Sequence, residues 1–153
     1  MEIKGLISED FINYKKPAMT IMFPRCTFKC NEALCQNSPL SKEKSIYLKI
    51  DDIVTRYINN PITESIVMQG LEPFDSWSDL LELIKKLRCF VDDDIVIYTG
   101  YYKDEIADKI HVLSEYKNII VKFGRYIPNQ EKHYDEVLGV YLASDNQYAE
   151  NIS

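Results

Sequence analysis

Three cysteines lie within ten residues of one another, at Cys26, Cys30 and Cys35, directly after an apolar run over residues 18–23. Three close thiols without a fourth nearby suit a metal centre with three protein ligands and one open coordination position, where chemistry can take place. The fourth cysteine, Cys89, lies far along the chain in a helix-like segment, where we expect a small buried side chain. The spacing therefore predicts a reactive metal centre rather than a closed structural one.

The composition fits one domain over residues 1–153, because 46% of the residues are hydrophobic and the length is typical of a single core. No apolar run is long enough to span a bilayer, and the first residues do not resemble a signal peptide, so we expect a cytoplasmic protein without a membrane partner. In that reducing compartment, clustered cysteines favour metal binding over disulfides. The net charge of −6 and the scattered basic residues argue against a nucleic acid partner.

Strands and helices are expected to alternate along the chain. Apolar runs predict strands over residues 18–23, 65–68, 94–99, 118–123 and about 137–142. Apolar residues at helical spacing predict helices over residues 50–58, 76–89 and 103–116. Ser76 and Asp79 resemble a capping box at the start of the second helix.

This alternation implies parallel strands joined by right-handed crossovers. Four such units are too few for an eight-stranded barrel. We therefore expect an α/β fold with a short, open partial barrel and a mostly parallel, curved sheet. Ligands bind at the carboxyl ends of the strands in such folds, and every expected strand is followed by glycine or small polar residues. These segments are the cysteine segment and residues 69–73, 98–101, 122–126 and 143–147.

The same segments resemble the radical S-adenosylmethionine (radical SAM) enzymes. The resemblance is carried by the cysteine triplet, the Gly-Leu-Glu-Pro turn at residues 70–73 and the segments 97–101, 123–126 and 144–147. It covers nearly the whole chain and is strongest to the activating proteins of anaerobic ribonucleotide reductase, which are glycyl radical enzyme activases. It implies a radical SAM type of partial barrel and an oxidoreductase that works under anaerobic conditions.

The resemblance implies a 4Fe-4S cluster held by Cys26, Cys30 and Cys35, and Asn37 matches the Cys-x-Asn that often ends the family's motif. Soft thiolates suit such clusters. The fourth iron would bind S-adenosyl-L-methionine, and the reduced cluster would cleave it to methionine and a 5′-deoxyadenosyl radical. In activases, this radical takes a hydrogen atom from a glycine of a partner protein. No catalytic residue beyond the cluster ligands is implied.

Further contacts to S-adenosylmethionine are implied by three of the matching segments. The residues concerned are Gly70, Leu71, Glu72, Pro73, Thr99, Asn146 and Gln147. The turn at residues 70–73 would accept hydrogen bonds from the methionine amino group, through backbone carbonyls and the Glu72 carboxylate. Thr99 could bind the ribose or the carboxylate, or simply its own loop. The two amides near the end of the chain suit the adenine edge.

The sequence departs from the family pattern at several positions. Four residues separate Cys30 from Cys35, where the family usually has two, and Leu34 replaces the common aromatic residue before the third cysteine. Leu71 occupies the place of a second glycine. The pair Lys122 and Phe123 stands where the family has an acidic residue before Gly-Arg.

Other functions are compatible with the sequence. The triplet could form a zinc site completed by His111 or His133, or the protein could be a non-catalytic iron–sulfur module or a radical enzyme for a small molecule. The short chain favours a macromolecular partner that closes the site. The resemblance suggests a glycyl radical enzyme such as anaerobic ribonucleotide reductase, contacting Arg125, Tyr126 and residues 128–134. It also implies an electron donor such as flavodoxin or ferredoxin.

Overall fold

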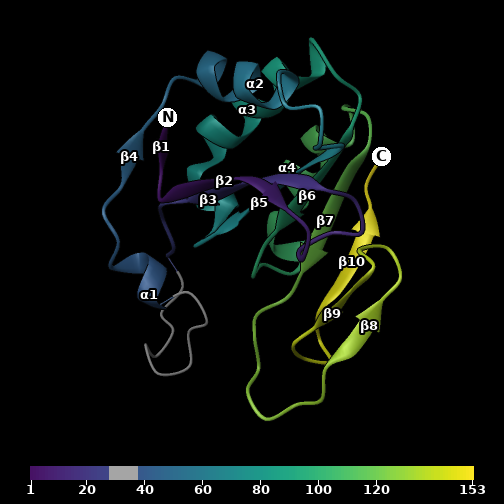
Figure 1. The fold of residues 1–153 in the computed structure, drawn as a ribbon. Helices are drawn as coiled ribbons and strands as arrows, with labels where there is room; N and C mark the ends of the chain where they lie inside the picture. Colours follow the sequence, from purple (N-terminus) through teal and green to yellow (C-terminus); the bar gives the residue numbers. More distant parts are fainter. Residues whose placement is uncertain (28–37) are drawn as a thin grey trace.

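The computed structural model describes residues 1–27 and 38–153, whose centre is a six-stranded sheet in the order β10-β7-β6-β5-β3-β2 (Figure 1). Four neighbouring strands are parallel, namely β3 (Ala18–Phe23), β5 (Ser65–Gly70), β6 (Asp94–Tyr98) and β7 (Ile119–Phe123). The edge strands β2 (Gly5–Asp10) and β10 (Tyr148–Asn151) run antiparallel to their neighbours β3 and β7. The architecture is therefore mixed α/β with a parallel centre.

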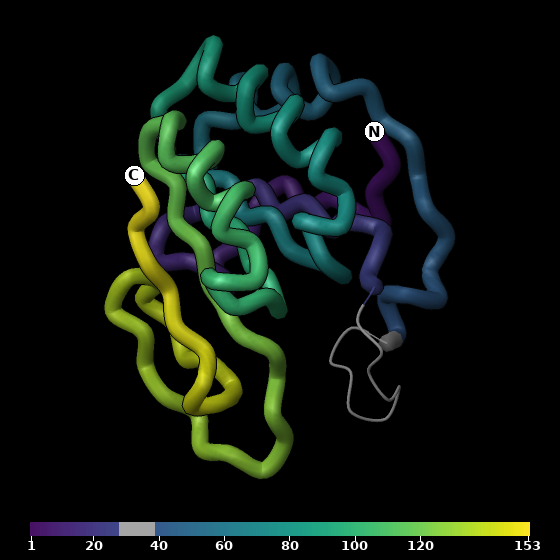
Figure 2. The backbone as a smooth tube through the Cα atoms, turned by 180° about the vertical axis from the view of Figure 1, so that it is seen from behind, coloured from purple at the N-terminus to yellow at the C-terminus, as the bar shows by residue number. Residues whose placement is uncertain are grey.

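Three helices cover one face of this sheet, as Figures 1 and 2 show: α2 (Ile50–Ile58), α3 (Trp77–Arg88) and α4 (Ala107–Leu113). Short 3-10 turns, η1 (Pro73–Ser76) and η2 (Lys103–Ile106), precede α3 and α4. Alternate residues of the parallel strands pack against the helices and form the larger core, including Ile21, Met68, Ile97 and Val121. This packing fixes the strand ends that carry the loops.

The opposite face of the sheet has a smaller core. Tyr14, Leu138 and Leu142 pack there against strand residues such as Val67 and Val96. The hairpin strands β8 (His133–Asp135) and β9 (Val140–Leu142) pair only with each other among the described residues. The remaining elements are the short pair β1 (Glu2–Ile3) and β4 (Ile46–Tyr47) and the helix α1 (Ser38–Ser41).

Most expected elements are confirmed. The strand over residues 18–23 and the helix over residues 50–58 have the predicted bounds, and the strands at 65–70, 94–98 and 119–123 differ by two residues or fewer. These four strands are parallel, as predicted. Within the described part of the chain the sheet ends at β2 and β10, and the radical SAM type of partial barrel stays a prediction.

Four expectations are wrong. The strand expected at residues 137–142 covers only Val140–Leu142 and belongs to the hairpin, because its partner is β8 and not the main sheet. The helix expected at 103–116 is a 3-10 turn followed by the seven residues of α4. Ser76 makes no side-chain cap to α3, and Cys89, at the C-terminal end of that helix, is exposed rather than buried.

The two antiparallel edge strands, β2 and β10, were not predicted from the sequence. The edge strand β2 carries Ser8, Glu9 and Asp10 in its second half, and β10 contains only four residues with two polar side chains. Such segments lack the long apolar run that marks a buried strand. No helix among residues 1–27 and 38–153 is long and apolar enough to cross a membrane.

Candidate functional site

The carboxyl ends of the four parallel strands meet at one edge of the sheet. Cys26 follows β3, the turn after Gly70 follows β5, Thr99 follows β6 and Gly124 follows β7. Cys26 is exposed there. Cys30, Cys35 and Asn37, the other parts of the predicted cysteine motif, lie outside the described residues. The fold thus brings the first predicted metal ligand to the same edge as the predicted cofactor loops.

The turn at residues 70–73 lies directly against the segment that leads to Cys26. Gly70 has φ of 101°, and a Cβ atom there would approach the backbone nitrogen of Phe23 to 2.5 Å, so only glycine fits. Beyond it, the N–H of Leu71 donates to the carbonyl of Phe23 at 3.2 Å, and the N–H of Glu72 donates to the carbonyl of Arg25 at 2.8 Å. The turn therefore holds the backbone immediately before Cys26.

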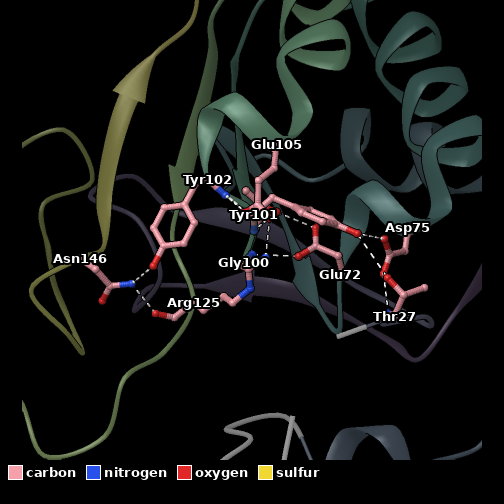
Figure 3. Close-up of polar contacts among 10 residues, drawn as sticks. Thr27, Glu72, Asp75, Gly100, Tyr101, Tyr102, Glu105, Arg125 and Asn146 are labelled. Carbon is pink, nitrogen blue, oxygen red and sulfur yellow. Dashed lines mark hydrogen bonds and ion pairs between the residues drawn. The ribbon is translucent and has the colours of Figure 1, made fainter. Parts of the chain in front are cut away.

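The side chain of Glu72 is fully buried and joins the ends of β5 and β6 (Figure 3). Its Oε1 accepts hydrogen bonds from the Phe74 N–H at 3.1 Å and the Thr99 hydroxyl at 2.8 Å. Its Oε2 accepts one from the Gly100 N–H at 2.8 Å. Burial raises the pKa of Glu72 to about 7, although these three hydrogen bonds oppose the increase.

Thr99 is buried as well, and its hydroxyl has two partners. It donates to Glu72 and accepts a 3.0 Å hydrogen bond from the Tyr101 N–H. The predicted cofactor residues Glu72 and Thr99 are therefore brought together, and each is bonded to protein groups. Their side chains join the loop after β5 to the loop after β6, and the backbone groups of both loops lie around this contact.

Asn146 and Gln147 form a second cluster with the loop after β7. The amide of Asn146 donates to the Tyr102 hydroxyl and to the Arg125 carbonyl, both at 2.7 Å (Figure 3). Gln147 donates to the Gly124 carbonyl at 3.3 Å and accepts from the N–H groups of residues 143 and 144. The two amides thus order the loops at 124–125 and 143–147.

The residues after β6 connect the two clusters. The N–H of Gly124 donates to the Tyr101 carbonyl at 3.1 Å, and the hydroxyl of Tyr102 binds Asn146. Arg125 forms a 2.7 Å ion pair with Glu105 and lies over the Tyr102 ring, 5.3 Å from its centroid. One continuous network therefore runs from the Arg25 carbonyl, directly before Cys26, to Gln147 along the carboxyl edge of the sheet.

A row of side chains lies at this edge on the helix-free face of the sheet. Met22 pairs in register with Gln69, and Tyr98 pairs with Lys122, on the strands β3, β5, β6 and β7. Alternation places these side chains opposite the helices. The Lys122 ammonium group is buried, donates to the Gly124 carbonyl at 3.1 Å and lies 5.7 Å from the Tyr98 ring centroid. Burial lowers the pKa of Lys122 to about 8.

The segment after Cys26 has its own anchor (Figure 3). The backbone N–H of Thr27 donates to Asp75 Oδ2 at 2.7 Å, and the Thr27 hydroxyl donates to the same atom at 3.0 Å. The Tyr101 hydroxyl donates to Asp75 Oδ1 at 2.6 Å. Ser41 lies on the other side of the undescribed residues 28–37, and its carbonyl accepts a hydrogen bond from the Lys4 ammonium group at 3.5 Å.

Sequence reasoning placed residues 98–101 at this edge but did not predict the contacts of Thr27 and Tyr101 with Asp75. In the sequence, Asp75 is an acidic residue near the expected start of a helix, which is a common position for such residues. No spacing rule links it to Cys26, 49 positions earlier. Lys122 did carry a signal, because it is the one charged residue in the apolar run of residues 119–123. A charge within a strand that is buried throughout marks a position with a specific partner.

The histidines considered for a zinc site lie on two different elements. His111 is in the last turn of α4, and His133 is in β8, where its Nδ1 atom is buried without a hydrogen-bond partner among the described residues. Residues 1–27 and 38–153 contain no group of three His, Cys, Asp or Glu side chains that could hold a metal ion.

Comparison with known families assigns the metal chemistry. The family described as "4Fe-4S single cluster domain" matches residues 18–148, and the chain therefore belongs to this family. No curated protein and no solved structure matches the chain. The protein is thus a 4Fe-4S iron–sulfur protein, and its metal-binding character as predicted from the cysteines is confirmed at that level.

Of the predicted cluster ligands, the structure describes Cys26, and its position fits such a cluster. Clusters of this type are held by cysteine thiolates, and Cys26 is exposed at a strand end where its backbone is fixed on both sides. Together with Cys30 and Cys35 it supplies three thiols from one segment. The two remaining predicted ligands come from the undescribed residues.

Proposed function

We propose that the protein is a radical SAM enzyme that reductively cleaves S-adenosylmethionine and generates a glycyl radical on a partner such as anaerobic ribonucleotide reductase. The observation that carries this proposal is the contact between the turn at residues 70–73 and the cysteine segment. The Glu72 N–H donates to the Arg25 carbonyl at 2.8 Å, directly before the first predicted cluster ligand. A ligand bound to the cluster would therefore lie beside this turn.

A reduced cluster would supply the one electron that cleaves the C5′–S bond of the sulfonium group into methionine and a 5′-deoxyadenosyl radical, and this radical would take a hydrogen atom from a glycine of the partner. The chain's own residues would bind and orient the nucleotide. Three ligands, Cys26, Cys30 and Cys35, would leave one iron open for it. The backbone of residues 70–73 and the Glu72 carboxylate would lie near its ammonium group.

Two further loops of the same edge support a nucleotide site. Thr99 lies at the end of β6, next to Glu72, and the Asn146 and Gln147 amides order the loops beyond β7. These loops follow β6 and β7, the two strands beyond β5 in the sheet, and so lie further along the carboxyl edge from the cysteine segment. An isolated electron-transfer cluster has no need for such an extended, hydrogen-bonded edge.

A protein partner would have to exclude water from the radical. Residues beside the second cluster offer a surface for it, because Tyr126 and Ile127 are exposed large hydrophobic side chains next to Arg125. We propose that this segment, with residues 128–134, contacts a glycyl-bearing loop of the partner. Flavodoxin or ferredoxin is the proposed electron donor.

Two measurements test the reaction. S-adenosylmethionine should change the electron paramagnetic resonance spectrum of the reduced cluster, and dithionite should release 5′-deoxyadenosine. Anaerobic affinity capture from the native cell should recover a glycyl radical enzyme. An unchanged spectrum at millimolar nucleotide would reject the enzyme. Tight coupling of nucleotide cleavage to modification of a metabolite would instead favour a small-molecule substrate.

A second function is favoured by one observation. The Glu72 carboxylate is fully buried and already accepts three hydrogen bonds from the protein. This arrangement also suits a turn that only supports the cluster, as in a non-catalytic iron–sulfur module for electron transfer. A reversible one-electron signal that does not respond to the nucleotide would identify that module.

A further inference from the structure

Cys26 lies between two hydrogen bonds that lead to one short segment. On its amino side, the Arg25 carbonyl accepts from the Glu72 N–H at 2.8 Å. On its carboxyl side, the Thr27 N–H donates to Asp75 Oδ2 at 2.7 Å. Glu72 and Asp75 are the N-cap and the third residue of η1. One rigid turn therefore holds the backbone on both sides of this cysteine.

The Asp75 carboxylate is itself held in place. Its Oδ1 accepts a 2.6 Å hydrogen bond from the Tyr101 hydroxyl, and the Thr27 hydroxyl adds a second contact to Oδ2 at 3.0 Å. Burial raises the pKa of Tyr101, and the hydrogen bond to Asp75 adds to the increase, so the phenol stays protonated as a donor. Both carboxylate oxygens therefore have fixed partners.

We propose that Asp75 is a positioning residue for Cys26 and that its charge tunes the iron–sulfur cluster. Fixing the backbone beside a ligand lowers the conformational entropy that the loop loses when a cluster binds. A negative charge close to a cluster stabilises its oxidised form and lowers its reduction potential. The inference rests on Cys26 as a ligand, which is part of the proposed function, and does not depend on nucleotide cleavage.

Four variants separate these effects. Asp75→Ala removes both the charge and the acceptor for Thr27. Asp75→Asn removes the charge but keeps one oxygen acceptor, and Tyr101→Phe leaves the carboxylate without its second support. Asp79→Asn is the matched control, because Asp79 carries the same charge in the first turn of α3. Each variant is reconstituted anaerobically with iron and sulfide, and circular dichroism verifies its fold.

The readouts are the rate of iron release to a chelator and the midpoint potential of the cluster, and neither requires activity. Because outer contacts of metal ligands typically contribute 10–100-fold to metal affinity, Asp75→Ala should release iron on the order of 10-fold faster than Asp79→Asn. Tyr101→Phe should lie between them. The potential should rise in both Asp75 variants and stay near the wild-type value in Asp79→Asn.

The outcomes distinguish the two proposals. If both Asp75 variants match Asp79→Asn in release rate and potential, the positioning role is wrong, even if their melting temperatures fall. If Asp75→Ala does not fold, the potential of Asp75→Asn decides alone. If Cys26→Ala retains its full iron content, the ligand assignment in the proposed function fails instead.

Discussion

The Thr99 hydroxyl donates a 2.8 Å hydrogen bond to the Glu72 carboxylate, and both side chains are buried. The bond joins the end of β6 to the turn after β5, 27 positions earlier in the sequence. The same carboxylate accepts from the Gly100 N–H, so a single acidic side chain sets the spacing of two loops. The protonation state of Glu72 should therefore affect the stability of the fold at the carboxyl edge of the sheet.

The first prediction is that wild-type stability falls as pH rises toward neutrality, because of Glu72. Burial raises the pKa of Glu72 from 4.5 to about 7, so the folded state holds a proton that the unfolded state has released between these values. The free energy of unfolding must then decrease with pH in this window, by on the order of 3 kcal/mol at most. Urea unfolding from pH 4.5 to pH 8 measures it.

Glu72→Gln is the matched variant, since it is neutral at every pH. In wild type, Thr99 and Gly100 donate to different oxygens of Glu72. The glutamine amide has only one oxygen acceptor, so the variant should be less stable than the protonated wild type at low pH. The difference in stability between wild type and variant should shrink as pH rises from 4.5 to about 7. A constant difference across this range would show that Glu72 is ionised throughout.

Lys122 should have the opposite effect on the alkaline side. Burial lowers the pKa of Lys122 from 10.5 to about 8, so the unfolded state binds the additional proton between these values. The contribution of Lys122 to the free energy of unfolding should therefore rise from pH 8 to pH 10.5, by on the order of 3 kcal/mol at most.

Lys122→Met should remove this rise, because methionine fills a similar volume without a titrating group. It also loses the hydrogen bond to the Gly124 carbonyl, which is a pH-independent cost of about 1 kcal/mol. Chemical denaturation at pH 7.5 and pH 10 compares the two proteins. Equal pH slopes would mean that the lysine is hydrated in solution and titrates normally.

Gly70→Ala should destabilise the fold and disturb the approach to Cys26. Its φ of 101° disfavours any side chain, and the Cβ atom would lie 2.5 Å from the Phe23 nitrogen and 2.8 Å from Met22 backbone atoms. Backbone strain of this kind costs on the order of 1–3 kcal/mol, before the clash is added. Thermal unfolding of the reconstituted and cluster-free proteins should show the loss in both.

Gly5→Ala provides the control for this substitution. Its Cβ atom would also make a close contact, at 2.9 Å, but with the terminal methyl group of Met22, which can rotate away. We expect a change of about 0.5 kcal/mol or less. If the two alanine variants were equally stable, the left-handed turn at residue 70 would not be needed to form the site.

The sequence predicted the parallel centre of the fold because its strands are mostly buried. Residues 18–23, 65–68 and 119–123 are mostly apolar, as is typical of strands covered on both faces. The edge strands β2 and β10 were not predicted, because they mix polar and apolar residues without a clear period. The hairpin β8–β9 was misplaced, since its short apolar run does not reveal which sheet it joins.

Those parts of the candidate site that are marked by residue spacing within one segment of the chain could be predicted from the sequence. The cysteine triplet and the turn at residues 70–73 were recognised from local sequence, and the structure brings Cys26 and Glu72 to one edge. Contacts between distant loops were not predictable. The Thr27–Asp75–Tyr101 contact joins three segments, and nothing in the chain pairs a particular carboxylate with a particular hydroxyl before the strands are aligned.

The last prediction concerns the cluster ligands. Anaerobically reconstituted wild-type protein should contain about four irons per chain, as expected for one 4Fe-4S cluster. Changing Cys26, Cys30 or Cys35 to Ala should abolish most of this iron, because a cluster held by three thiolates loses a third of its protein bonds. Cys89→Ala is the matched control, since Cys89 is exposed at the C-terminal end of α3 and its thiol donates to the Lys85 carbonyl at 3.4 Å. Iron and acid-labile sulfide assays measure the content, and the electronic spectrum measures the cluster type. A stoichiometric zinc content after anaerobic, iron-supplied expression, or loss of iron in Cys89→Ala, would overturn this ligand assignment.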